Sequence, residues 1–309
     1  MAEVIVAVAS FRRPEGLRRL LDAVARLETS AQVSVVVVEN DSERREALAV
    51  CEQLCGQQYR WPLTCVVAEE RGIAQARNAG VEYILARSRA EFVAMLDDDE
   101  WPDAQWLDAF LHVQRLTGAD ALQGAVIPKL ERTAGRWARQ CHGIAPVQRE
   151  TGLIPSIDST SNVFVRRACL EKVPKPCFDP DFALSGGEDR DFFERLRRQG
   201  RRFAWVNDAV VYAWVPASRA RFAWALKRAY RTGNSDMRVF LKHRPGTPQL
   251  AREIVKIAGA ALVYAPLALI SMPFVRRQAH ALCKLCRAAG KTAALAGHRY
   301  DEYATVHGR

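Results

Sequence analysis

The fold of this chain is indicated most clearly by residues 91–100, which read EFVAMLDDDE. Five consecutive apolar residues are typical of a short strand buried on both faces, and the acidic run marks the point where the chain returns to solvent. Three similar apolar runs precede this stretch, at residues 4–8, 33–38 and 63–67. We therefore expect a strand at each of the four places.

Segments of helical periodicity separate these runs. Apolar residues recur at helical spacing over residues 15–27, 44–54 and 73–86. Alternating strands and helices predict a parallel sheet that is covered on both faces. The expected fold class is therefore α/β, with a single, mainly parallel, Rossmann-like sheet flanked by helices.

Polar clusters follow three of the predicted strands, at residues 10–13, 39–42 and 97–100. Parallel sheets bind ligands beyond the carboxyl ends of their strands, so we expect these clusters to form a site along one edge. The acidic run at residues 97–99 would repel itself unless a cation lies beside it. Because Mg²⁺ and Mn²⁺ prefer one or two carboxylates plus phosphate oxygens, the run predicts a metal-bound diphosphate. The alternative is a solvated turn before a helix N-terminus, where acidic residues are also favourable.

The pattern becomes less regular after residue 100. A helix is expected over residues 101–116, and strands at residues 125–127 and 161–165 would extend the sheet. A glycine-rich turn at residues 185–187 leads into a helix at residues 188–196. By itself, the acidic start of that helix is explained by N-terminal capping.

Four motifs, in this order and spacing, resemble the second family of glycosyltransferases, which has the GT-A fold. They are SFRRP at 10–14, ENDS at 39–42, RGIAQARNAG at 71–80 and LDDDEWP at 96–102. A further motif, GGED at 186–189, resembles a segment of several inverting GT-A enzymes. The resemblance covers residues 4–230. It implies an inverting hexosyltransferase of the exopolysaccharide or lipid-linked glycan type, which uses Mn²⁺ or Mg²⁺ and a nucleotide diphosphate sugar, with a UDP-sugar as the expected donor.

The resemblance also assigns roles to individual residues. Contacts with the nucleotide sugar are expected from Ser10, Phe11, Arg13, Glu39, Arg71, Arg77, Asp97 and Asp98. Asp99 is the expected metal ligand, with Asp97 as a second. Asp189 is the expected catalytic base, and Glu188 and Gly187 are expected to contact the acceptor. For Arg77, the alternative that the residues leave open is a surface arginine on an amphipathic helix.

Two departures from the family pattern concern the ligands. This chain has Glu39-Asn40 where an aspartate pair is more usual. The segment at residues 210–216 lacks the histidine that several GT-A enzymes supply as a third metal ligand, and His243 is the nearest downstream candidate. Trp205 and Trp214 are candidates for stacking on a sugar, although aromatic residues in strands usually belong to the core.

Charge and hydropathy set the C-terminal part apart. Residues 1–200 carry a net charge of −4, whereas residues 201–309 carry +14. Residues 257–275 are uncharged, interrupted by Pro266 and long enough to span a membrane, with basic residues on both sides. Because both ends then favour the same side, we expect an in-plane or re-entrant contact with anionic lipid. The alternative is a buried packing helix, and the charge pattern does not favour nucleic acid as a partner.

These observations predict a catalytic domain at residues 1–230, with a nucleotide-binding half (1–100) and an acceptor half (101–230). Residues 231–309 would form a basic and apolar helical extension that associates with the membrane. The chain enters its first strand without a signal-peptide pattern, so the cytoplasmic face of the cell membrane is the expected location. The spacing of the eight cysteines predicts reduced thiols.

Two other functions remain open from the residues alone. A sugar-nucleotide nucleotidyltransferase also holds a diphosphate against a parallel sheet, but SFRRP is not the glycine-rich basic loop that it ordinarily has after the first strand. A non-catalytic protein that binds the membrane surface would account for the C-terminal part alone.

Overall fold

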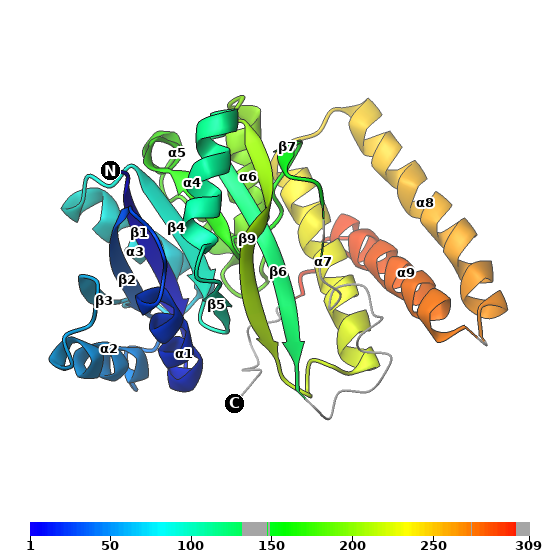
Figure 1. Ribbon diagram of the computed structural model, residues 1–309. Helices are drawn as coiled ribbons and strands as arrows, with labels where there is room; N and C mark the ends of the chain where they lie inside the picture. Colours follow the sequence, from blue (N-terminus) through cyan, green and yellow to red (C-terminus); the bar gives the residue numbers. More distant parts are fainter. Residues whose placement is uncertain (132–146, 148, 273, 301–309) are drawn as a thin grey trace.

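The computed structural model describes residues 1–131, 147, 149–272 and 274–300. Its N-terminal half confirms the four predicted strands, which lie parallel in the order β3-β2-β1-β4 (Figure 1). Their bounds are Glu3–Ser10 for β1, Gln32–Glu39 for β2, Leu63–Val67 for β3 and Phe92–Asp97 for β4. The connecting helices are α1 (Pro14–Ala25), α2 (Glu46–Gly56) and α3 (Ile73–Arg87).

The same sheet continues beyond β4 with mixed strand directions. Strand β8 (Val163–Arg166) lies antiparallel to β4, and β6 (Ala121–Leu130), β9 (Phe203–Val215) and β5 (Glu100–Pro102) follow in that order. The short β7 (Gly152–Ile154) pairs with β9. A single sheet flanked by helices was predicted and is confirmed, and its antiparallel pairs all lie in this second half.

Helices cover both faces of the sheet. Helices α1, α2 and α4 (Trp106–Thr117) cover one face of the sheet, where they form a core with strand side chains such as Val6 and Val35. Helices α3, α5 (Arg167–Lys172) and α6 (Glu188–Arg198) cover the other face, where they form a second core with strand side chains such as Ile5 and Val93. Burial on both sides explains the near-continuous Val and Ile runs in the sequence.

The helix predicted over residues 101–116 is wrong at its start. Trp101 and Pro102 belong to β5, which pairs antiparallel with β9, and α4 begins at Trp106. Proline lacks an N–H group and is tolerated in a strand at the edge of a sheet. The Trp101 ring packs 6.0 Å from that of Tyr212 on β9. Pairing and ring contact together hold residues 100–102 extended.

The C-terminal part contains α7 (Phe222–Lys242), α8 (Thr247–Ile270) and α9 (Val275–Leu295). Helix α7 runs across residue 230, the predicted end of the catalytic domain. Helix α9 packs closely on α7 because glycines stand at the contact. A Cβ atom on Gly233 would lie 2.0 Å from the carbonyl oxygen of Arg287, and one on Gly290 would lie 2.0 Å from that of Tyr230.

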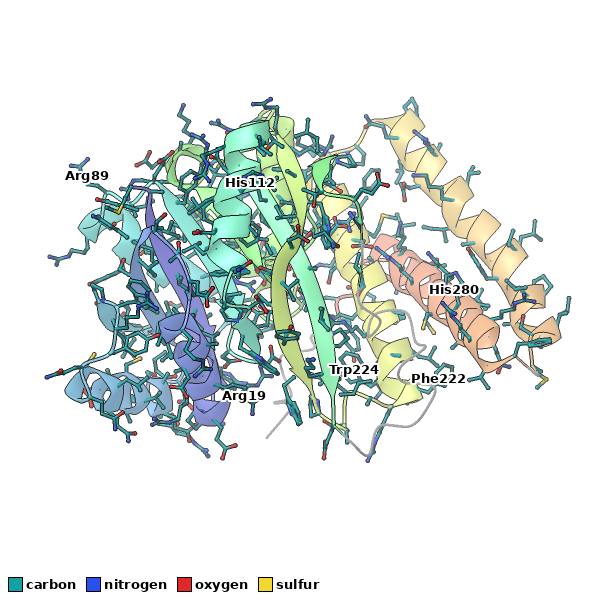
Figure 2. The ribbon with its side chains drawn as sticks, in the orientation of Figure 1. Arg19, Arg89, His112, Phe222, Trp224 and His280 are labelled. Atoms are coloured by element: carbon teal, nitrogen blue, oxygen red, sulfur yellow. The ribbon has the colours of Figure 1, made fainter. Side chains whose placement is uncertain are left out.

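Helix α8 stands at the outer side of this assembly and reaches the rest of the chain through α9 (Figure 1). It is continuous through Pro266 and is long and apolar enough to cross a membrane. Its apolar side chains are mostly exposed, with Leu262 at 78% and Ile270 at 76%, so it is not a buried packing helix. The Tyr264 ring lies 5.9 Å from that of His280. Figure 2 shows His280 on α9. Pro273 lies outside the described residues.

Seven cysteines fall within the described residues, and all are free thiols; Cys51, Cys169, Cys177 and Cys283 are buried, whereas Cys55 is exposed.

Candidate active site

The middle aspartate of the acidic run points into the protein. Asp98 is 4% exposed, and its carboxylate accepts hydrogen bonds from Ser10 Oγ (3.1 Å), the Phe11 amide (3.0 Å) and Arg13 Nη1 (2.8 Å). Burial raises the pKa of Asp98 to about 6, although Arg13 opposes the shift. Asp98 therefore fixes the loop after β1 against the loop after β4.

The outer two aspartates face the edge of the sheet. Oδ1 of Asp97 lies 3.2 Å from Arg77 Nη2, and Oδ2 of Asp99 lies 3.1 Å from Arg13 Nη1. Arg219 Nη1 approaches the same Asp99 oxygen at 3.0 Å. Within the described residues, no hydrogen bond uses the second oxygen of Asp97 or Asp99.

The donor set suits Mn²⁺ or Mg²⁺ held by protein and substrate together. Asp97 and Asp99 offer carboxylate oxygens, and these ions bind one or two carboxylates together with phosphate oxygens. No cluster of three or more His, Cys, Asp or Glu residues that could hold a metal occurs in the described ranges. Nε2 of His243 lies 3.1 Å from Asp191, so His243 is engaged by α6.

Arg77 connects the two halves of the site. Its Nη2 contacts Asp97, and its Nη1 donates a short hydrogen bond to Glu188 at the start of α6. The Arg77 side chain is 11% exposed and that of Glu188 is 3% exposed, so this is not a surface arginine. The arginine therefore links the acidic run to the first turn of α6, and its contact with Glu188 spans 111 residues of sequence.

The start of α6 presents its carboxylates through two glycines. Gly186 and Gly187 have φ values of 72° and 108°, in the left-handed region that favours glycine. A Cβ atom on Gly187 would lie 3.1 Å from that of Ser235 on α7, so the turn also packs tightly. Asp189 follows in the first helical turn, half-buried, and accepts a 2.7 Å hydrogen bond from the Arg190 amide.

Glu188 differs from its neighbour Asp189 in burial and in electrostatics. Burial, together with the adjacent negative charge of Asp189, raises the pKa of Glu188 to about 7 despite Arg77. Its Oε2 atom is buried without a hydrogen-bond partner among the described residues. A protonated Glu188 can donate a hydrogen bond, and its contact with the acceptor stays a prediction.

The loop after β2 is organised by Glu39. This carboxylate is 1% exposed and accepts hydrogen bonds from the amides of Asp41 (2.8 Å) and Ala47 (2.7 Å). Asn40 Oδ1 accepts one from the Gly72 amide (3.0 Å), which ties the loop to the start of α3. A contact between Glu39 and a nucleoside stays a prediction, and the described bonds position the loop around it.

Phe11 offers an aromatic surface beside this loop. The guanidinium groups of Arg12 and Arg71 each lie 4.9 Å from its ring centroid. Ser10, Phe11 and Arg13 are thus gathered by Asp98, while Arg71 reaches Phe11 from the start of α3. These are the residues for which the sequence predicts contacts with the nucleotide sugar.

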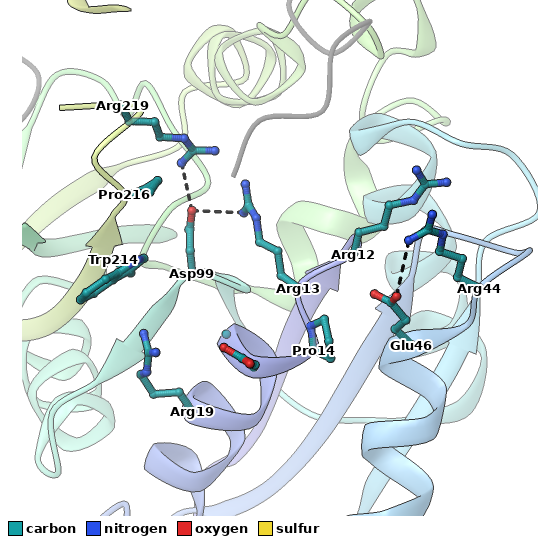
Figure 3. A pocket seen from close by; sticks show the side chains of 12 residues that line it. Arg12, Arg13, Pro14, Arg19, Arg44, Glu46, Asp99, Trp214, Pro216 and Arg219 are labelled. Carbon is teal, nitrogen blue, oxygen red and sulfur yellow. Dashed lines mark hydrogen bonds and ion pairs between the residues drawn. The ribbon is translucent and has the colours of Figure 1, made fainter. Parts of the chain in front are cut away.

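A pocket of about 440 Å³ lies beside Asp99 (Figure 3). Arg12, Arg13, Arg19, Arg44 and Arg219 line it together with Trp214, which is 38% exposed. Trp205, by contrast, is 4% exposed and belongs to the core, so the structure does not support it as a stacking residue. The sequence did not single out Arg219. The only signal for it was its place just after the segment that lacks the expected histidine.

Comparison with known proteins identifies the family. The model of the family described as "Glycosyl transferase family 2" matches residues 5–173. The chain belongs to glycosyltransferase family 2. The chain is also similar to the succinoglycan biosynthesis protein ExoM of Rhizobium meliloti (strain 1021), with 32% identity over 259 residues that cover 82% of this chain and 80% of ExoM.

Two solved structures show the same GT-A fold as this family 2 glycosyltransferase. One is the mannosyltransferase PcManGT from Pyrobaculum calidifontis in complex with GDP-Man and Mn²⁺, with a TM-score of 0.59 and 20% identity, covering 94% of this chain and 86% of that one. The other is TarS 1-349 of S. aureus in complex with UDP, with a TM-score of 0.51 and 16% identity, covering 96% of this chain and 92% of that one. At these identities the likeness shows the fold.

Proposed function

We propose that this glycosyltransferase is a divalent-cation-dependent, inverting hexosyltransferase. It would move a sugar from a nucleotide diphosphate sugar to a hydroxyl of a lipid-linked glycan during exopolysaccharide or envelope glycan synthesis. The similarity to ExoM supports this setting. The observation that carries the proposal is the bridge from Asp97 through Arg77 to Glu188. It brings the carboxylate of Asp97, a proposed ligand of the metal, and the first turn of α6 into one site.

In this proposal Asp189 removes the proton from the acceptor hydroxyl. The acceptor oxygen then forms its bond to the anomeric carbon of the donor sugar from the face opposite the diphosphate, and the bond from that carbon to the diphosphate oxygen breaks with its electron pair on the diphosphate. Arg77 holds Asp97 and Glu188 at a fixed separation while this happens. Glu188 and the backbone at Gly187 orient the acceptor.

In this proposal the carboxylates of Asp97 and Asp99 hold the divalent cation. A bound Mn²⁺ or Mg²⁺ would supply Lewis-acid stabilisation of the charge that grows on the diphosphate. Among structures with this fold, PcManGT is in complex with GDP-Man and Mn²⁺, and TarS is in complex with UDP. For this chain, UDP-sugars are the first donors to test, followed by GDP-sugars.

We also propose that α8 places the enzyme on the cytoplasmic face of the cell membrane. Its exposed apolar residues continue past the end of the helix to Met272, Phe274 and Val275, and Arg276 and Arg277 follow. An apolar surface bordered by guanidinium groups suits insertion into anionic lipid headgroups. Vesicle flotation tests this attachment. The protein should float with vesicles that contain phosphatidylglycerol, and the double variant Leu262→Asp/Ile270→Asp should not.

A radiolabelled sugar-transfer assay on membrane extracts tests the enzymatic proposal. Transfer should require Mn²⁺ or Mg²⁺ and disappear in Asp189→Asn, while calorimetry shows that this variant still binds the donor nucleotide. Loss of donor affinity in Asp189→Asn would contradict the role of Asp189 as base. Pyrophosphate release from a nucleoside triphosphate and a sugar phosphate would instead indicate a nucleotidyltransferase. No binding of any nucleotide would favour a membrane-surface binding protein.

A further inference from the structure

The charge around Asp99 is unbalanced. One carboxylate oxygen meets two guanidinium groups, Arg13 from the loop after β1 and Arg219 from the turn after β9 (Figure 3). Both arginine side chains are about three-quarters buried, with 26% and 24% exposure. Arg13 also forms an ion pair with Asp98, whereas Arg219 forms an ion pair with Asp99 only, among the described residues.

Arg219 retains hydrogen-bonding capacity. Its Nη1 contacts Asp99, and within the described residues no hydrogen bond uses its Nε or Nη2 atoms. These atoms form part of a planar fork that suits two oxygens of a phosphate group. A pocket of about 440 Å³ that is lined by five arginines adjoins it.

The first turn of α1 adds to the same electrostatic field. The helix begins at Pro14, no side chain caps its N-terminus, and Pro14, Glu15 and Gly16 of its first turn line the pocket. Helix N-termini carry partial positive charge and favour anions. Gly16 allows this helix to approach the acidic loop, because a Cβ atom there would lie 2.5 Å from the carbonyl oxygen of Asp98.

We propose that Arg219, together with Arg13, binds the diphosphate of the donor beside Asp99. Arg219 then supplies positive charge from the turn just after residues 210–216, the segment that lacks the expected histidine. The diphosphate would be held between Asp99, with its cation, on one side and the two guanidinium groups on the other. This inference rests on the proposed function, since it takes the donor to be a nucleotide diphosphate sugar.

Calorimetric titration of nucleotides into the full-length protein tests the assignment. UDP and UMP, or GDP and GMP if the protein prefers guanine, are titrated with Mn²⁺ and again with EDTA. Arg219→Ala should weaken binding of the diphosphate at least tenfold and that of the monophosphate less than threefold, because the fork faces the leaving group. Arg219→Lys should recover part of the loss, since it keeps the charge but not the planar fork.

Arg44→Ala is the matched control. Arg44 lines the same pocket, but it pairs with Glu46 at 3.8 Å and its side chain is 48% exposed. Its loss should change diphosphate affinity less than twofold. An Arg219→Ala variant with wild-type affinities for both nucleotides would overturn the assignment and leave the proposed function standing. A wild-type protein that binds neither UDP nor GDP with Mn²⁺ would overturn both.

Discussion

Arg190, the residue after the proposed base Asp189, donates a 2.7 Å hydrogen bond from Nη1 to Oδ1 of Asp236 on α7. The other oxygen of Asp236 accepts a 3.0 Å bond from Nε of Arg287 on α9. Asp236 is 7% exposed, so one buried carboxylate joins the helix of the proposed base to the C-terminal helices. A change at Asp236 should therefore affect both stability and turnover.

Asp236→Asn should lower the free energy of unfolding by about 1–3 kcal/mol, because two guanidinium groups lose their charged partner. It should also lower kcat, since Arg190 adjoins Asp189. Urea denaturation and steady-state kinetics measure the two effects. Glu194→Gln is the control, since its partners Arg197 and Arg198 are about half exposed; that change should lower the free energy of unfolding by less than about 1 kcal/mol. Equal effects of the two substitutions would contradict the buried link.

Glu188 should make the stability of the protein depend on pH. Its pKa is raised from 4.5 to about 7, so its stabilising contribution is fully present below pH 4.5 and is lost as the pH rises through 7. Glu188→Gln cannot ionise and should not lose stability over this interval. Between pH 5 and pH 8, urea denaturation should show the free energy of unfolding of the wild type falling by about 2–3 kcal/mol relative to that of the variant. A constant difference would show that Glu188 ionises normally.

Gly187→Ala should destabilise the protein through both its backbone and its contacts. The residue has a φ value of 108°, and an added Cβ would lie 3.1 Å from Ser235. We expect a loss of about 1–3 kcal/mol in the free energy of unfolding, together with a fall in kcat because the first turn of α6 must move. Gly200→Ala provides the comparison, since its φ is 75° and nothing lies within 4 Å of the added atom. The melting temperature of Gly200→Ala should be clearly higher than that of Gly187→Ala.

The helix contact between α7 and α9 can be tested in the same way. Gly233→Ala would place its Cβ 2.0 Å from the backbone of Arg287, and main chain cannot move aside as a side chain can. We expect at least about 2 kcal/mol of destabilisation. Gly259→Ala on the exposed α8 meets nothing within 4 Å and should instead stabilise its helix by about 0.5–1 kcal/mol. If both substitutions changed the free energy of unfolding in the same direction, the close packing would be contradicted.

The N-terminal half of the fold was predictable because helices cover both faces of its sheet. Its strands are therefore rich in Val and Ile, and such apolar runs are visible in the sequence. Residues 101–102 were not, since their extended shape comes from pairing with β9, more than a hundred residues away. The acidic run was predictable as a cluster, but which of its members points inward depends on Ser10, Phe11 and Arg13 closing around Asp98.

Residues in irregular turns gave little signal. Arg219 lies in a turn after β9, and only the assembled sheet brings it to Asp99. The sequence predicted a nucleotide-sugar contact for Arg77, whereas its bridge from Asp97 to Glu188 links segments whose proximity the sequence pattern does not encode. Long-range pairing of charged groups is therefore the part of the site that only the structure supplies.

The glycines at the contact of α7 with α9 have a consequence for the choice of substrate. Because α9 lies directly against α7, and α7 contacts the turn before Asp189, the body of the enzyme and the helices that carry α8 form one continuous packed unit. With α8 in the headgroup layer, the proposed base would lie at a constant height above the bilayer. Acceptors would then be discriminated by how far their terminal sugar stands from the lipid, so glycan length itself would act as a specificity determinant.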